Sequence, residues 1–408
     1  MHMGHTLWVG GILLVVGLLT GCSWTVQPAD PLQTPYREPL IPTPLPNSPP
    51  TPTPPPSALG ETAAMRGAVT VPELPAPYTL RWRMGAGVPD GRSPAELAWP
   101  HLRPGWYLNW SAGYTTTVAA AGIVVDAQPP PALTVADMVV PADTDIGMEF
   151  APMVWVDGAQ LRPPAEWLAA TAAALPGRTW LVGNEPDVKW QGNSTPAEYA
   201  RAYHLAYSTL KAADPTAQVA IGGVSQVTPL RLAYLDAVLE AYAAQFGAEM
   251  PVDVWNIHVF VLQEKAGDWG VDIPPGMTAE VGELWTIDDH DDLALVEAQI
   301  RRMRAWLVAR GRPDMPLWIT EYGILMPAEY GFDAERVRRF MLGSFDLFLT
   351  LRDPGLGYGA DDDRLVQRWM WFSTGYELYP TGDLFTPEGR PTTLLDTFVA
   401  YLAEYADE

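Results

Sequence analysis

Short apolar or β-branched runs alternate with stretches of helical periodicity over residues 78–408, which narrows the possible folds sharply. Strands that alternate with helices form parallel βα units, because a parallel connection needs a long crossover. Eight strands in one such series predict an α/β fold, the (β/α)8 TIM barrel. The candidate strands are Thr79–Ala86, Gly105–Trp110, Gly147–Trp155, Thr179–Asn184, Gln218–Gly223, Val252–Phe260, Pro316–Glu321 and Val366–Phe372.

The helices expected between these strands carry their own start signals. Ser-Thr-Pro begins the helix Pro196–Ala213, and acidic residues begin the helix Asp291–Arg310. Residues 111–146 read instead as a β-hairpin or an irregular insertion. An open doubly wound sheet is the competing architecture, but Gly85-Ala86-Gly87 lacks the third glycine of a phosphate-binding loop. The expected helices are Pro196–Ala213, Leu230–Phe246, Asp291–Arg310, Asp333–Leu351 and Thr392–Tyr405.

The first residues of the chain resemble a bacterial lipoprotein signal. An apolar run over residues 7–19 is too short to cross a membrane comfortably, and Leu19-Thr20-Gly21-Cys22, which follows it directly, resembles a lipobox. The sequence therefore predicts a signal peptide over residues 1–21 and lipidation of Cys22. A lipidated Cys22 would anchor the protein to the membrane at the bacterial cell surface.

Thirteen prolines lie between Pro28 and Pro56. Proline has no backbone N–H, so this segment cannot form helical or sheet ladders. We expect an extended polyproline-II tether over residues 22–77, which would hold a catalytic domain, residues 78–408, away from the anchor.

The chain carries 25 Lys and Arg against 48 Asp and Glu, for a formal net charge of −23. This balance argues against nucleic acids and anionic lipid headgroups as partners, because binding to phosphates needs clustered cations. The single cysteine excludes an intramolecular disulfide and a thiolate zinc cluster. We expect a monomer that touches the membrane only through its lipid anchor.

Catalytic side chains of a (β/α)8 barrel come from the carboxyl ends of its strands. Those ends carry Asn184 and Glu185 on the fourth strand, His258 on the sixth and Glu321 on the seventh. Two facing carboxyl groups can divide acid–base and nucleophilic work, and a retaining glycosidase needs them about 5 to 5.5 Å apart. Glu185 and Glu321 are therefore the candidate catalytic pair.

Asn-Glu-Pro on the fourth strand and Trp-x-Thr-Glu-Tyr-Gly on the seventh resemble the retaining (β/α)8 glycoside hydrolases of clan A. The resemblance implies that Glu185 is the acid/base, that Glu321 is the nucleophile and that Asn184 holds the sugar 2-hydroxyl. It also implies that Trp371 on the eighth strand floors the sugar site. The run Glu149–Trp155, followed by Gly-Asn-Glu-Pro-Asp, is similar to the Asl1-like glycosyl hydrolases, which implies cleavage of β-1,3-glucan.

The sixth strand departs from that pattern. It reads His258-Val259-Phe260 where the family has His-x-Tyr, so the tyrosine hydroxyl that would hydrogen-bond the nucleophile is missing. We expect Tyr322 or Tyr376 to supply a donor instead. Residues 261–290 form a long insertion that we expect to roof the cleft and set substrate choice. The acids of 288–292 after it read as a helix start rather than a metal site.

Further substrate-binding candidates are His258, Trp155, Tyr322 and Asn109, the last of which precedes Trp110. Each has an alternative role, because a neutral histidine can tie loops together and tryptophan is heavily buried on average.

The sequence thus predicts a cell-surface glycoside hydrolase that cleaves β-linked polysaccharide by a two-glutamate double displacement, with no cofactor and no metal. Two alternatives remain open. One is a non-catalytic carbohydrate-binding lipoprotein on the same fold, which Phe260 favours. The other is a metal-dependent barrel enzyme with Glu185, His258 and Glu321 as ligands, since hard divalent ions prefer oxygen-rich sets.

Overall fold

The computed structural model describes residues 78–89, 104–113 and 148–404, all within a unit that spans Leu32–Glu408. The expected signal peptide, Cys22 and the proline-rich tether lie outside these residues, as does most of the 111–146 insertion. Within the three described ranges, no helix is long and apolar enough to cross a bilayer.

The strands are β1 (Met84–Gly87), β2 (Trp106–Leu108), β3 (Glu149–Phe150), β4 (Met153–Asp157), β5 (Gln160–Arg162), β6 (Thr179–Asn184), β7 (Gln218–Gly223), β8 (Trp255–His258), β9 (Leu317–Tyr322) and β10 (Arg368–Trp371). The α-helices are α1 (Leu80–Arg83), α4 (Ala165–Ala174), α5 (Pro196–Ala213), α6 (Pro229–Phe246), α7 (Leu293–Ala309), α8 (Ala334–Thr350) and α9 (Thr393–Glu404). Short 3-10 helices are η3 (Ile287–Asp291), η4 (Ala328–Tyr330), η5 (Gly359–Asp361) and η6 (Pro380–Gly382).

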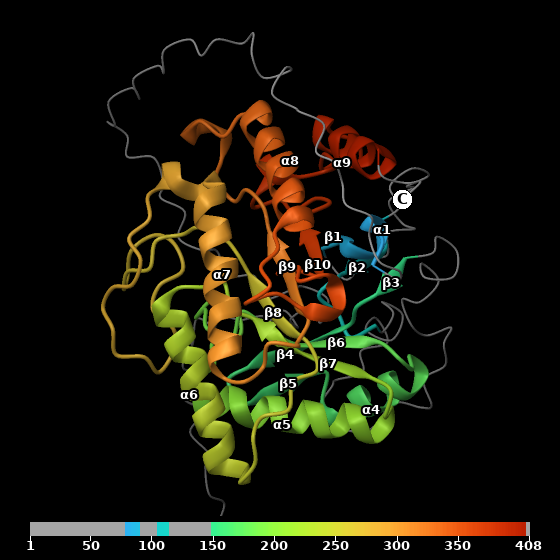
Figure 1. Ribbon diagram of the computed structural model, residues 1–408, viewed down its shortest axis with the longest axis vertical. Helices are drawn as coiled ribbons and strands as arrows, with labels where there is room; N and C mark the ends of the chain where they lie inside the picture. The colour runs from blue at the N-terminus through green and yellow to red at the C-terminus, as the bar shows by residue number, and fades with distance from the viewer. Residues whose placement is uncertain (1–77, 90–103, 114–147, 405–408) are drawn as a thin grey trace, which may run out of the picture. The chain divides into compact units, whose positions relative to one another are not determined.

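Hydrogen bonds join the strands into two sheets (Figure 1), with the order β3-β2-β1-β10-β9-β8 in one and β5-β4-β6-β7 in the other. All pairings between these strands are parallel except that of β4 with β5, so the carboxyl ends gather at one edge. Isolated bridges from Ala220 to Val254 and from Val224 to Ile257 link the β7 and β8 segments. Only two residues separate β3 from β4. The result is an α/β fold with parallel sheets, compatible with a (β/α)8 barrel.

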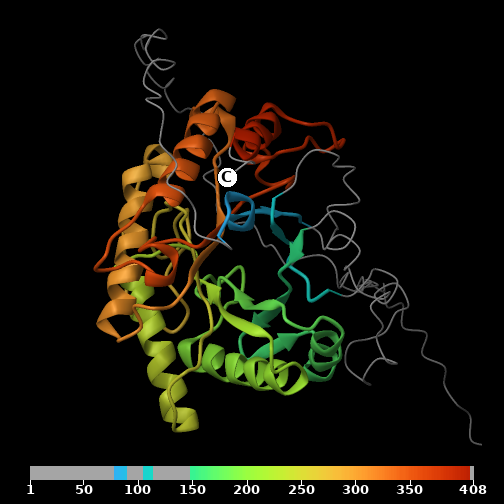
Figure 2. The same cartoon turned by 45° about the vertical axis from the view of Figure 1, so that its right-hand side comes forward.

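The long helices lie along the outside of the strands (Figures 1 and 2). α5 packs against α4 and α6, and α8 packs against α7 and α9. Side-chain caps set where they begin: Thr228, Asp292 and Asp333 accept backbone N–H groups at the starts of α6, α7 and α8. Asp292 therefore confirms that the acids of 288–292 form a helix start.

A cation–aromatic cluster occupies the amino-terminal ends of the strands. Arg368, the first residue of β10, donates to Glu149 of β3 at 2.6 Å. Its guanidinium lies over the rings of Trp82 and Trp318, 4.1 Å and 4.7 Å from their centroids. The candidate site lies at the opposite, carboxyl-terminal ends of the strands.

Several boundaries expected from the sequence are confirmed without change, namely those of β6, β7 and α5. The expected strand Thr79–Ala86 is wrong in its first half, because Thr79 accepts the N–H of Trp82 and begins the helical turn α1. The expected strand Gly147–Trp155 is two strands, and neither β5 nor α4 was expected.

Candidate active site

Glu185 stands in the first position after β6. Its backbone has φ of +40°, a left-handed conformation that is uncommon outside glycine. Three backbone hydrogen bonds hold it there: its N–H donates to the carbonyl of Gly223, and its carbonyl accepts from Val188 and Gly192. This strained turn aims the carboxyl group away from the strand and toward the neighbouring strand ends.

Arg231 fixes the loop that carries Glu185. Its guanidinium is fully buried, and its Nε donates to Asp187 at 2.7 Å, two residues after Glu185. The same guanidinium donates to Glu264 and to the carbonyls of Val271 and Asp272. Buried charges persist where they are paired and hydrogen-bonded, and this network joins the loops after β6 and β8 to the start of α6.

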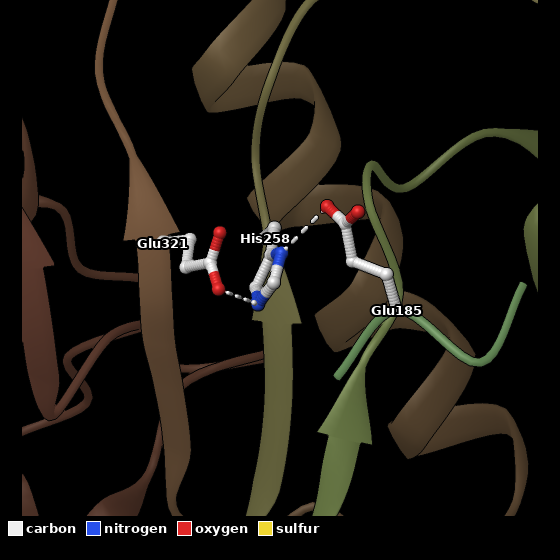
Figure 3. Close-up of side chains that lie close together, drawn as sticks. All are labelled: Glu185, His258 and Glu321. Atoms are coloured by element: carbon white, nitrogen blue, oxygen red, sulfur yellow. Dashed lines mark hydrogen bonds and ion pairs between the residues drawn. The ribbon is translucent and has the colours of Figure 1, made fainter. Parts of the chain in front are cut away.

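The imidazole of His258, at the end of β8, lies between the two candidate carboxylates (Figure 3). Its Nδ1 is 3.0 Å from Oε1 of Glu185, and its Nε2 is 3.8 Å from Oε1 of Glu321. Gly223 makes room for the ring, since a Cβ at that position would lie 2.6 Å from Cδ2 of His258. One oxygen of each glutamate and one nitrogen of the histidine all lie within 4.8 Å of one another.

Glu321 is fully buried in β9. Its Oε1 accepts a hydrogen bond from the indole Nε1 of Trp110 at 2.7 Å. Its Oε2 has no hydrogen-bond partner among the described residues. One carboxylate oxygen is therefore held by the protein, and the other is buried without a hydrogen-bond partner among these residues.

Burial and charge shift the pKa values of this group in a consistent way. Burial raises the pKa of Glu321 to about 7, against the lowering effect of His258, and the charge of Glu185 adds to the rise. Burial lowers the pKa of His258, but Glu321 and Glu185 outweigh it, so the net pKa of His258 is raised. The protonated imidazole is thus stabilised by the two carboxylates on either side of it.

Asn184 ends β6 and is completely buried, yet neither atom of its side-chain amide has a hydrogen-bond partner among the described residues. It lies near enough to Glu321 to lower the pKa of that carboxyl. A buried amide without partners is costly, and a ligand hydroxyl beside Glu321 would supply both a donor and an acceptor.

Trp155 and Asn109 make hydrogen bonds that hold the backbone around Trp110. The Nε1 of Trp155 donates to the backbone carbonyl of Trp110 at 2.6 Å. Oδ1 of Asn109 accepts from the backbone and the hydroxyl of Ser111, on the other side of Trp110. The structure therefore brings both expected residues close to the site, where their hydrogen bonds shape the Trp110 loop.

Two expected substrate-binding residues face away from the site. Tyr322 packs edge-on against Phe348 of α8, with ring centroids 4.9 Å apart, and Trp371 packs against Tyr322 at 5.5 Å. The Nε1 of Trp371 donates to the carbonyl of Gly382. The assignments of Trp371 as the sugar floor and of Tyr322 as a substrate contact are corrected, because both rings fill the space between the strands and α8.

The aromatic side chain of the eighth strand segment that does face the site is Phe372. Its ring lies edge-on to Trp110 at 5.6 Å and to Phe260 at 6.4 Å. The donor to Glu321 is Trp110, and not Tyr322 or Tyr376 as expected from the sequence. Sequence reasoning placed Trp110 at a strand end but gave it no role, and it missed Phe372 and Gly223. The only signal for Trp110 was its position directly after a candidate strand.

Residues 90–271 match the family model described as glycosyl hydrolase catalytic core. The match includes Asn184, Glu185 and His258 and ends before Glu321. It confirms the expected enzyme class, a glycoside hydrolase. No curated protein matches the chain significantly.

Solved structures with some similarity include two endo-β-1,3-glucanases described as GH128 subgroup II. The one from Pseudomonas viridiflava is 21% identical, with a TM-score of 0.49 over 78% of this chain and 97% of the other. The one from Sorangium cellulosum is 16% identical, with a TM-score of 0.48 over 78% and 98%. A subgroup I enzyme from Amycolatopsis mediterranei, in complex with laminaritriose, is 21% identical, with a TM-score of 0.41 over 78% and 98%.

Proposed function

We propose that this protein is a retaining glycoside hydrolase that cleaves β-linked polysaccharide by double displacement. The observation that carries the proposal is the approach of Glu185 and Glu321, from the ends of β6 and β9, with oxygens within 4.8 Å of one another. Retaining enzymes place their carboxyl groups about 5 to 5.5 Å apart, whereas inverting enzymes leave about 6.5 to 9.5 Å for a water. The short separation supports retention.

In the first step, Oε2 of Glu321 attacks the anomeric carbon as the bond to the leaving oxygen breaks, and Glu185 gives its proton to that oxygen. In the second step, Glu185 takes a proton from a water whose oxygen attacks the anomeric carbon, and the bond between that carbon and Oε2 of Glu321 breaks, which releases the sugar. The unpartnered amide of Asn184 is suited to the hydroxyl next to the anomeric carbon. His258, which contacts Glu185, holds the acid/base in place between the two steps.

β-1,3-Glucan is the substrate we propose. The support is the resemblance of the Glu149–Trp155 run and the Gly-Asn-Glu-Pro-Asp sequence to Asl1-like enzymes. The solved glucanases named above make laminarin-type glucans the first substrates to test.

Closure of the two sheets into one (β/α)8 barrel is part of the proposal. It is supported by the bridges between the β7 and β8 segments and by the two-residue gap between β3 and β4, which pair with different sheets. A barrel places the catalytic glutamates on strands four and seven of the series, where they face a common mouth.

We also propose a location at the bacterial cell surface, with the chain held by a lipid on Cys22 and displayed on the proline-rich tether of residues 22–77. Its support is the lipobox-like Leu19-Thr20-Gly21-Cys22 sequence alone.

The first test is hydrolysis of β-1,3-, β-1,4- and mixed-linkage glucans, mannan and xylan by the purified full chain, with Glu321→Gln as the inactive control. Proton NMR of the first product should show the β-anomer before mutarotation. An α-anomer as first product would exclude retention.

Two other functions give different results in the same assay. A non-catalytic binding protein, the reading that Phe260 favours, would bind a glucan and release no product. A metal-dependent enzyme using Glu185, His258 and Glu321 would lose activity in EDTA and regain it with a divalent ion. Turnover that survives EDTA would exclude the metal reading.

A further inference from the structure

We propose that Trp110 is the hydrogen-bond donor that holds the nucleophile Glu321 for attack. It takes the role of the tyrosine hydroxyl that the family pattern has at position 260, just after β8, where this chain has Phe260. This inference rests on the proposed function, since it assigns Glu321 as the nucleophile. It concerns a residue from the end of β2, on a different strand from the one on which a tyrosine was expected.

The contact is short and protected from water. Nε1 of Trp110 lies 2.7 Å from Oε1 of Glu321, in the range of charge-assisted hydrogen bonds. Trp110 is 5% exposed and Glu321 is 0% exposed. A hydrogen bond to a charged group in such surroundings is worth more than a neutral one in water, so the indole favours the carboxylate over the carboxylic acid.

The chain bends locally to put the indole there. Trp110 has φ of +54°, a left-handed conformation that turns its side chain out of the direction of β2. The hydrogen bond from Trp155 to its carbonyl fixes this turn. At the end of β1, Gly87 leaves space for the ring, because a Cβ there would lie 2.8 Å from Cη2 of Trp110. Three separate elements thus cooperate to position one donor.

The residue at position 260, after β8, cannot make this contact. Phe260 has no donor, and its ring lies edge-on to His258 at 6.1 Å. His258 itself is 3.8 Å from Oε1 of Glu321, beyond hydrogen-bond length, and its Nδ1 contacts Glu185. Among the described residues, Trp110 is therefore the donor that Glu321 has.

The identity of the donor has chemical consequences. An indole N–H donates but neither accepts nor ionises in the working pH range, so it cannot give its proton to Glu321 or to the leaving group. Because it binds Oε1, Oε2 is the oxygen free to form the bond to the anomeric carbon. The donor lowers the basicity of the carboxylate and so favours its ionised form against the opposing effect of burial, while Glu185 supplies the only proton that the leaving oxygen receives.

The test that does not depend on turnover is NMR of the full chain labelled with 15N at its tryptophan indoles. One indole resonance should shift downfield and titrate as Glu321 ionises. It should vanish in Trp110→Phe and cease to titrate in Glu321→Gln. Trp369→Phe is the matched control, because Trp369 is also buried but its Nε1 has no hydrogen-bond partner among the described residues. A Trp110 resonance that ignores both pH and Glu321→Gln would overturn the proposal.

The kinetic test measures the pH dependence of kcat/KM. Trp110→Phe should lower kcat/KM by about 10- to 100-fold and move its acidic limb to higher pH, since the carboxylate loses the donor that stabilises it. Trp369→Phe should change neither. Trp155→Phe keeps the indole of Trp110 but removes the hydrogen bond that holds the Trp110 carbonyl. It should move the acidic limb in the same direction by a smaller amount, and it replaces Trp110→Phe as the test variant if Trp110→Phe does not fold. An unmoved limb in both site variants would refute the role of Trp110.

The two measurements separate this inference from the proposed function. If the wild-type chain cleaves no glycan while the Trp110 resonance still follows Glu321, the hydrogen bond stands and the hydrolase proposal fails. If glycans are cleaved while the resonance does not respond, the hydrolase stands and the donor assignment fails.

Discussion

His258 contacts Glu185 through Nδ1, at 3.0 Å from Oε1, and so turns its other ring nitrogen toward the second carboxylate of the site. Both carboxylates stabilise the protonated ring. Glu185 and Glu321 are therefore coupled through one side chain, and a change at either carboxylate is felt at the other.

Glu185→Ala should reduce kcat/KM for natural glucans by about 10² to 10⁴-fold, the usual contribution of general acid catalysis. Aryl glycosides with acidic phenols need little protonation, so their glycosylation step should be affected much less. Steady-state kinetics on both substrate types checks this, with Glu149→Ala as control because Glu149 pairs with Arg368 at the opposite ends of the strands. Equal losses on both substrate types would contradict the acid/base role.

Glu321 should carry the covalent intermediate. A 2-fluoro sugar with a good leaving group should label it, because the fluorine slows breakdown of the glycosyl-enzyme. Mass spectrometry of the peptide that contains Trp318–Tyr322 should locate the label. Glu321→Gly should be inactive on the natural substrate and regain a product of inverted configuration with azide. Labelling of a different carboxyl group would remove Glu321 from this role.

Gly223→Ala should lower kcat/KM by at least about 10-fold, because the new Cβ would meet the His258 ring and displace it from between the carboxylates. Gly355→Ala is the control, since its Cβ would make only an ordinary contact of 3.4 Å with Asp353. Circular dichroism and thermal unfolding separate loss of activity from loss of fold. Full activity in Gly223→Ala would show that the ring position does not matter.

Thermal stability should contain a component that falls as pH rises from about 5 to 8. Glu321 has a pKa of about 7 in the folded state against an ordinary value of 4.5, so the folded state holds an extra proton between these values. Its favourable contribution is present below about pH 4.5 and is lost as pH passes 7, and the raised pKa of His258 acts in the same direction above 6.5. Glu321→Gln should flatten the curve of Tm against pH, whereas substitution of the exposed Glu329 by Gln should not. A slope that is unchanged in Glu321→Gln would place the titration elsewhere.

Cys22→Ser should release the protein from the membrane fraction or leave the signal peptide uncleaved, because the lipid attachment point is gone. Incorporation of labelled fatty acid into the wild type and its loss in the variant, read by gel fluorography, checks this. Labelling that persists in Cys22→Ser would rule out Cys22 as the anchor.

The sequence was informative where local patterns decide the outcome. Glu185 and Glu321 are placed at strand ends by short motifs, and the α5 boundary follows from Thr195 and Pro196. The side that a residue faces was harder to predict. Trp369 and Trp371 both pack against α8, so Phe372, one residue further on, lies at the site in place of Trp371.

Trp110 could not be assigned a role for a related reason. Its contact with Glu321 spans 211 positions in the sequence and depends on one left-handed backbone residue. Positive φ at a tryptophan has no signature in composition or periodicity. The same holds for the room that Gly223 leaves for His258, which only the packed structure reveals.

The buried guanidinium of Arg231 joins Asp187, Glu264 and the backbone at Val271 and Asp272. None of these segments can swing outward without stranding a charge in the interior, so they behave as one rigid wall beside Glu185. On the proposed function, a sugar bound beside Glu185 would meet a preorganised surface, at little cost in ordering entropy. Attempts to redirect specificity there should therefore exchange Arg231 and its partners together, or leave all of them untouched.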